Sequence, residues 1–207
     1  MRGLTMTLWQ DLSARVHERL RTMNDGQQAM FACAVAERLM RRHEALTEQN
    51  QQAFTLALRP LLDASWNKAC GDQTAFTEIK QALGEYYLSD YCHNDGQDGP
   101  NDADESAAAA VIYAAEFAMH GCLEFATWAG LRGEEAADQA GWDSDEELDE
   151  DADEDELVHI ELRQQLSDLD LIDQHADDLQ YARNGRDIAT ISRLHNEVKA
   201  ALSGQPL

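Results

Sequence analysis

The sequence predicts an all-α protein, a single helical bundle of about seven or eight helices with an acidic disordered loop near residues 143–156. Three observations predict this class. Apolar residues make up 43% of the 207 residues, which is enough for one packed core and short for two, so we expect one domain over residues 1–207. The chain has only three prolines, and good helix formers outnumber β-branched residues. Apolar side chains recur every three or four residues in most segments, as on the buried face of a helix.

The first half of the chain contains four segments with this helical period. Residues 5–22 form an amphipathic helical pattern, which ends at the Asn-Asp-Gly triplet that follows. Residues 27–46 carry apolar side chains on two adjacent stripes, so we expect a central helix that is buried on two sides. In the segment 50–70, Pro60 predicts a kink or a break. A further helix should run from about residue 74 to about residue 91.

The second half of the chain alternates apolar helices with polar segments. Residues 92–106 consist of turn-forming residues and predict a loop. Residues 106–131 are the most apolar stretch and predict one core helix, followed by a turn and a brief helix over 133–141. Two more helices are expected over about 155–182 and 188–202. The apolar register of the first of these includes Leu157, Ile160, Leu162, Leu166 and Leu169.

The charge of the chain lies mainly in its middle. The formal net charge is −24, and residues 81–182 hold 29 acidic and only two basic side chains. Direct binding to nucleic acid is therefore not expected, because that affinity depends on Lys and Arg neutralising phosphates. No stretch approaches the roughly 20 apolar residues of a membrane span, and the N-terminus lacks the apolar run of a signal peptide, so we expect a cytoplasmic protein. We interpret the scattered cysteines as reduced thiols in mainly apolar helical contexts: Cys33, Cys70, Cys92 and Cys122.

Residues 143–156 contain eleven carboxylates in fourteen positions. Such a segment repels itself and predicts a loop, for which several interpretations stay open: a solubilising loop, adaptation to high salt, weak calcium binding, or a docking element for a basic protein, including mimicry of nucleic-acid charge. The EF-hand order of calcium ligands is absent. The residues that we expect to bind a basic partner are Asp149, Glu150, Asp151, Asp153, Glu154 and Asp155.

A second group of candidate residues carries metal-ligand chemistry. Glu116, His120 and Glu124 recur at four-residue spacing and would share one face of the predicted core helix. His159 belongs to the single Glu-x-x-His motif, of which a carboxylate-bridged di-metal bundle uses two. The alternative is a solvated polar face or a hydrogen-bonded core histidine. No spacing typical of a structural zinc site and no phosphate-binding loop is present, so no cofactor is predicted.

The segment MFACAVAERLMRRHEAL resembles the opening signature of the YjaG-like bacterial proteins, which form domain-of-unknown-function family 416. The matching residues are Phe31, Cys33, Glu37 and Arg38, and the similarity continues thinly through LLDASWNK, with Leu62 and Trp66, into the Ala-rich helix after residue 105. Here RRHEAL continues directly, where the family has an aromatic and Pro-rich link. The resemblance implies an all-helical bundle without known catalytic residues. We interpret the Glu37-Arg38 pair as a helix-to-helix salt bridge or a capping contact, and the alternative is a functional ion pair that lines a groove.

Two functions follow as hypotheses. The first is a non-enzymatic interaction or accessory protein that presents an acidic surface to a basic protein partner. The second is a metal-dependent enzyme with a helical carboxylate and histidine site. The sequence favours the first, and it contains no catalytic constellation that names a reaction.

Deletion of residues 143–154 should leave the fold intact, because a self-repelling acidic segment with almost no apolar residues adds little to a core. Thermal melting of the full-length and shortened proteins should give nearly coincident transitions. A melting temperature lower by many degrees, or insoluble expression, would show that the segment packs on the helices.

Overall fold

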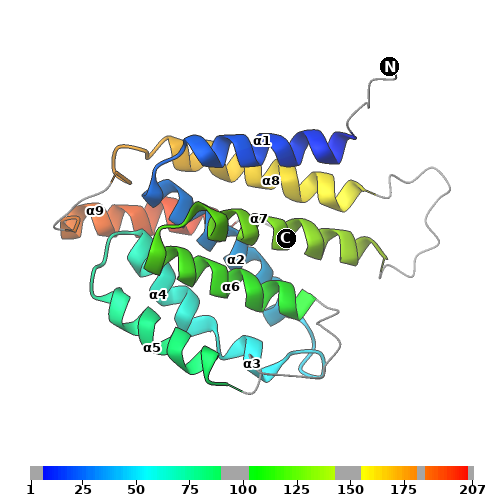
Figure 1. Ribbon diagram of the computed structural model, residues 1–207, viewed down its shortest axis with the longest axis horizontal. Coiled ribbons are helices and arrows are strands. Elements are labelled where there is room, and N and C mark those ends of the chain that lie inside the picture. Colours follow the sequence, from blue (N-terminus) through cyan, green and yellow to red (C-terminus); the bar gives the residue numbers. More distant parts are fainter. Residues whose placement is uncertain (1–6, 90–102, 143–154, 181–184, 205–207) are drawn as a thin grey trace.

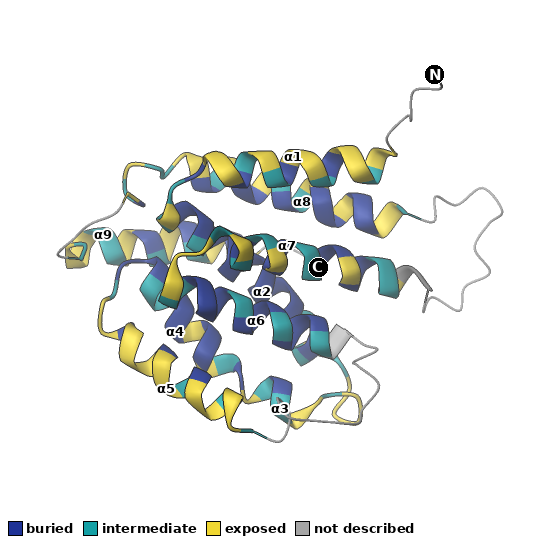
Figure 2. Ribbon diagram, viewed as in Figure 1, coloured by how far each residue is buried: buried dark blue, intermediate teal, exposed yellow. Residues whose placement is uncertain are grey.

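Helix α2 (Asp25–Ala45) runs through the middle of the computed structural model, which describes residues 7–89, 103–142, 155–180 and 185–204 (Figure 1). Almost every residue from Gln27 to Met40 is buried, because α2 packs against α4 (Arg59–Ala69), α6 (Ala103–His120), α7 (Leu123–Trp142) and α8 (Glu156–Asp173). The prediction of a central helix is confirmed. Figure 2 shows the contrast with the peripheral helices, whose outer faces are exposed.

The described residues form eight helices when adjoining segments are counted together, and no strand, so the predicted all-α class is confirmed. Helix α1 (Leu8–Thr22) begins at a capping box formed by Thr7 and Gln10 and lies beside α8. None of the helices in these ranges combines the length and hydropathy that crossing a bilayer requires. The predicted acidic loop falls outside the described residues except for its last two positions.

Pro60 marks a helix boundary, as predicted. The short helix α3 (Ala53–Leu56) ends before it, and α4 begins with Pro60 in its first turn, where the missing backbone N–H costs nothing. Helix α5 (Ala75–Tyr87) then covers α4 and ends about four residues before the predicted boundary near residue 91. The N-terminal half therefore follows the predicted order of helices, with a shift at one end.

The predicted single helix over 106–131 is wrong. Helix α6 ends at His120 because Gly121 adopts a φ of +62°, the left-handed conformation that commonly ends helices, and its N–H donates to Phe117. Helix α7 starts two residues later and continues to Trp142. The predicted turn and brief helix over 133–141 are therefore also wrong.

Gly133 lies inside α7 for a packing reason. A Cβ atom added there would lie 2.6 Å from Oε1 of Glu161 on α8, so a side chain at this position would have to displace the carboxylate of Glu161. Gly133, which the sequence pattern predicts to lie in a turn, is instead a contact point between α7 and α8.

Helix α8 ends at Asp173, and residues 174–180 form turns, so the predicted extension to 182 is wrong. Its buried face also differs from the prediction. Leu157 and Ile160 are 41% and 51% exposed, whereas Glu161 and Asp168 are buried. The physical reason is that Arg38 of α2 lies opposite α8 and requires carboxylate partners on that face. The last predicted helix is confirmed as a continuous run of α9 (Ile188–Arg193), a π-helical turn η1 (Leu194–Lys199) and α10 (Ala200–Ser203).

The core combines small and large side chains. Phe31 and Trp66 are fully buried in one cluster that includes residues of all the long helices. Three of the four cysteines are described, and all three are free thiols. Cys33 and Cys70 are buried, and burial raises the pKa of Cys70 to about 12. Cys122 is exposed just after Gly121, so it is not in the predicted kind of apolar helical context.

Phe31→Ala and Trp66→Ala should each lower the free energy of unfolding by about 3–5 kcal/mol, because each removes a large, fully buried side chain. Chemical denaturation measures this loss. Phe76→Ala is the matched control, since Phe76 is 40% exposed on α5 and its loss should cost much less. A loss below about 1 kcal/mol for both core variants would contradict the assigned core.

Candidate functional site

The predicted metal-ligand stripe is divided between two helices. Glu116 is buried near the end of α6, where Oε2 lies 3.1 Å from Nε2 of the exposed His120 and Oε1 accepts a hydrogen bond from the hydroxyl of Tyr87. Glu124 lies beyond the break at Gly121 and accepts a hydrogen bond from the thiol of Cys122 at 2.8 Å. The structure therefore brings Glu116 and His120 together and gives Glu124 a different partner.

His159 lies on another part of the bundle. It is buried on α8, which packs against α1, α2 and α7, whereas Glu156 of the same Glu-x-x-His motif is exposed. Within the described ranges, no group of three or more His, Cys, Asp and Glu side chains is arranged to hold a metal ion.

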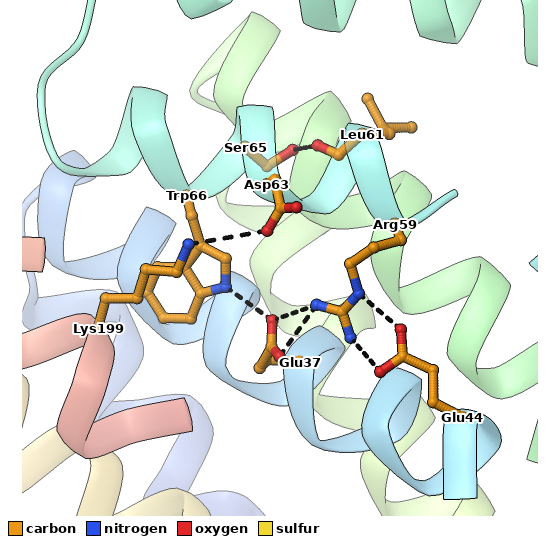
Figure 3. A network of polar contacts seen from close by, with 8 residues as sticks. All are labelled: Glu37, Glu44, Arg59, Leu61, Asp63, Ser65, Trp66 and Lys199. Atoms are coloured by element: carbon orange, nitrogen blue, oxygen red, sulfur yellow. Dashed lines mark hydrogen bonds and ion pairs between the residues drawn. The ribbon is translucent and has the colours of Figure 1, made fainter. Parts of the chain in front are cut away.

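Glu37 and Arg38 are adjacent in sequence and belong to two separate polar networks. Figure 3 shows the first, in which Arg59 donates bidentate hydrogen bonds to Glu44 at 2.7 and 2.8 Å and also binds Glu37 at 2.8 Å. The indole N–H of Trp66 donates to Glu37 as well, at 3.2 Å. Burial by itself lowers the pKa of Arg59, but the bonds to Glu44 and Glu37 outweigh it, so the pKa is raised. The network joins α2 to α4.

The second network is centred on the buried guanidinium of Arg38. It donates to Glu161 at 2.8 Å and to Asp168, both on α8, and Asp168 also accepts a hydrogen bond from Gln164 at 2.9 Å. Burial lowers the pKa of Arg38, but the two carboxylates more than reverse this and raise it. Burial raises the pKa of Asp168 despite the stabilising charge of Arg38. Both networks are helix-to-helix contacts, as we interpreted the Glu37-Arg38 pair.

The partners of Arg38 were not identified from the sequence. Glu161, Gln165 and Asp168 are spaced by four and three residues, in register with the buried face of α8. Polar residues at positions that lie on the buried face of a helix predict a buried polar network, because a buried charge needs an oppositely charged or hydrogen-bonding partner. The identity of the partner helix, however, depends on tertiary packing.

A cavity of about 350 Å³ lies among the ends of α2, α4 and α6, and it contains Lys68 and Arg186. The guanidinium of Arg186 donates to backbone carbonyl oxygens of Asp178 at 2.5 Å and Gln180 at 3.2 Å. Arg186 also donates to the backbone carbonyl oxygen of Ala69 on α4 at 3.5 Å, so it joins the turns after α8 to that helix, which is a structural role.

The acidic segment is anchored at one end of the bundle. Of its six predicted partner-binding residues, only Asp155 is described; it is half-buried and occupies the N-cap position of α8. Asp149, Glu150, Asp151, Asp153 and Glu154 lie outside the described residues. Helix α7 ends and α8 begins at the same end of the molecule (Figure 1). The described carboxylates at this end of α7 and α8 that are not buried are Glu135, Asp138, Asp155 and Glu156.

Arg38→Met should lower the free energy of unfolding by about 3–5 kcal/mol at neutral pH, because it leaves two buried carboxylates without a positive partner. The difference from wild type should shrink as the pH falls from about 7 to about 4, since protonation removes the uncompensated charge. Urea denaturation at several pH values measures both effects.

Arg19→Met is the matched control for that variant. Arg19 also joins its helix to α8, through Asp170, but this pair is exposed and its loss should cost less than about 1 kcal/mol. Equal losses for the two variants, or a loss for Arg38→Met that does not depend on pH, would contradict the role assigned to the buried network.

Comparison with known proteins gives no relative. No family model matches the chain, and neither a curated protein nor a solved structure shows significant similarity to it. The resemblance to the YjaG-like family therefore stays a prediction.

Proposed function

We propose that this chain is a non-enzymatic interaction or accessory protein of the cytoplasm, which presents an acidic surface at the α7–α8 end of its bundle to a basic protein partner. The observation that carries this proposal is the distribution of charge. Between Arg132 and Arg163 the sequence contains fifteen carboxylates and no lysine or arginine. Of these carboxylates, Glu134 and Glu161 are buried in the bundle. Helix α7 ends and helix α8 begins at one end of the molecule (Figure 1), so we expect the negative charge of the others to be concentrated at that end.

The positive side chains elsewhere do not offset this charge, because internal pairs hold many of them. Arg38 and Arg59 bind carboxylates on their neighbouring helices, and Arg193 lies 2.5 Å from Asp178. A basic partner would supply the missing counter-charge and would be attracted over the Debye length of about 8 Å at physiological ionic strength. Nucleic acid would be repelled by the same field.

The alternative is a metal-dependent enzyme that uses Glu116, His120, Glu124 and His159. Of these four residues, the described contacts join only Glu116 and His120. A catalytic metal usually has three protein ligands, so at least one further ligand would have to come from another residue. The elemental composition of the purified protein separates the two functions. Stoichiometric iron, manganese or zinc that resists mild chelation would favour the enzyme.

Replacing Asp149, Glu150, Asp151, Asp153, Glu154 and Asp155 by Asn or Gln should abolish retention of the partner in a pull-down from native lysate. Binding by the wild-type protein should weaken strongly as salt is raised, since exposed charges are screened. The far-UV spectrum should remain helical, because the replaced side chains flank the bundle.

A matched control removes the same number of charges from other surfaces. It neutralises six exposed carboxylates on other parts of the chain: Glu18, Glu48, Glu78, Glu85, Asp177 and Glu197. This control should retain the partner. If the segment variant and the wild type retain the same proteins, or neither retains any, the proposed docking function fails.

A further inference from the structure

Three aromatic side chains form a cluster on the surface between α6 and α7. The ring of Trp128 lies 5.5 Å from that of Tyr113 and 5.3 Å from that of Phe125, which it meets nearly at right angles. Trp128 is 43% exposed, although a tryptophan gains most when its large apolar surface is buried. Part of the indole ring of Trp128 is therefore exposed to solvent, while the rings of Tyr113 and Phe125 pack against the rest of it.

The same cluster already holds one guanidinium from its own chain. The Cζ atom of Arg132 lies 5.9 Å from the centroid of the Tyr113 ring, within the range of a cation–π interaction. Arg132 also pairs with Oε2 of Glu135 at 2.6 Å. An aromatic ring with a carboxylate beside it suits an arginine side chain, because the planar guanidinium stacks on rings and donates two parallel hydrogen bonds to a carboxylate.

A cavity of about 270 Å³ opens at this cluster and is lined by Tyr113, Trp128, Leu131, Arg132 and Glu135. The described charged groups at and near this cavity are Arg132, Glu135 and, from α6, Glu105, so carboxylates outnumber the single guanidinium there. The side chain of Glu135 is 51% exposed, and burial raises the pKa of Glu105, which lies near Arg132 and Glu135. An incoming cation would therefore meet an open indole ring and carboxylates at one place.

The cluster lies on the helix that leads to the acidic end of the bundle. Trp128, Arg132 and Glu135 are spaced by four and three residues, so they share one face of α7. That helix leads directly to the acidic segment, and its rise places Trp128 about 21 Å from the last helical residue, Trp142. A basic polypeptide bound to the acidic segment can reach the cluster along α7.

We propose that the cluster of Tyr113, Phe125 and Trp128 binds an arginine side chain of the basic protein partner, with Trp128 stacking on the guanidinium and Glu135 contributing a carboxylate. This inference rests on the proposed function and adds a chemical preference to it. The acidic segment attracts any cation, whereas an aromatic cluster favours arginine over the strongly hydrated ammonium of lysine. The partner is therefore expected to be rich in arginine.

The test compares nona-arginine and nona-lysine peptides of equal charge, with affinities measured by fluorescence anisotropy at low salt. Wild-type protein should bind the arginine peptide more tightly. Trp128→Ala should weaken arginine binding by about 2- to 30-fold, the range expected for one cation–π contact, and should bring the two peptides close to equal affinity. Trp128→Phe should retain part of the preference.

Phe76→Ala serves as the matched control, because Phe76 is a similarly exposed aromatic residue on α5, away from this cluster. It should leave both affinities unchanged. Thermal melting and far-UV spectra verify that each variant is folded. If folded Trp128→Ala keeps the wild-type preference while neutralising the acidic segment removes binding, the arginine site is refuted and the proposed function stands. If neutralising the segment changes neither affinity, the proposed function itself fails.

Discussion

The buried ion cluster between α2 and α8 constrains how the rest of the bundle is assembled. Arg38 lies in the middle of the central helix, and it can be buried only because Glu161 and Asp168 face it from α8. This requirement fixes the rotation of α8 about its own axis, so that Leu157 and Ile160 are exposed while charged residues lie inside. It also fixes the side of α2 on which α7 packs, because α7 contacts α8 as well, and it sets the position of α1, which packs mainly on α8.

The network at Glu37 positions α4 against α2, and the network at Arg38 positions α8 against α2. Adjacent residues on a helix point in directions about 100° apart, so consecutive charges can serve two different neighbours. Glu37 is directed to Arg59 and Trp66 of α4, and Arg38 is directed to α8. Neighbouring apolar contacts supply most of the stability, whereas these charged pairs select the orientation of each helix, since a wrong rotation would leave a buried charge without a partner.

Periodicity in the sequence predicts which segments are helical, but it does not predict how glycines act within them. Gly121 ends a helix, whereas Gly133, which the sequence pattern predicts as a turn, lies inside one. The space beside Gly133 is filled by Glu161, a residue distant in the sequence. For the same reason Phe125 and Trp128 could be placed on one helical face from their spacing, whereas Tyr113 joins them only through the packing of α6 on α7. The contact between Glu116 and His120 could be predicted, because the two residues are four apart on one helix. Glu124 does not join them, because the helix ends at Gly121 and Glu124 binds Cys122 instead.

The close contact at Gly133 bears on which substitutions the bundle tolerates. The polar ends of Glu161 and Gln165 fill the space where a Cβ atom at residue 133 would lie. Glu161 is also a partner of Arg38, so a side chain at residue 133 would displace a carboxylate that the buried guanidinium requires. A position on α7 is thereby coupled to the ion cluster between α2 and α8, although it carries no charge of its own.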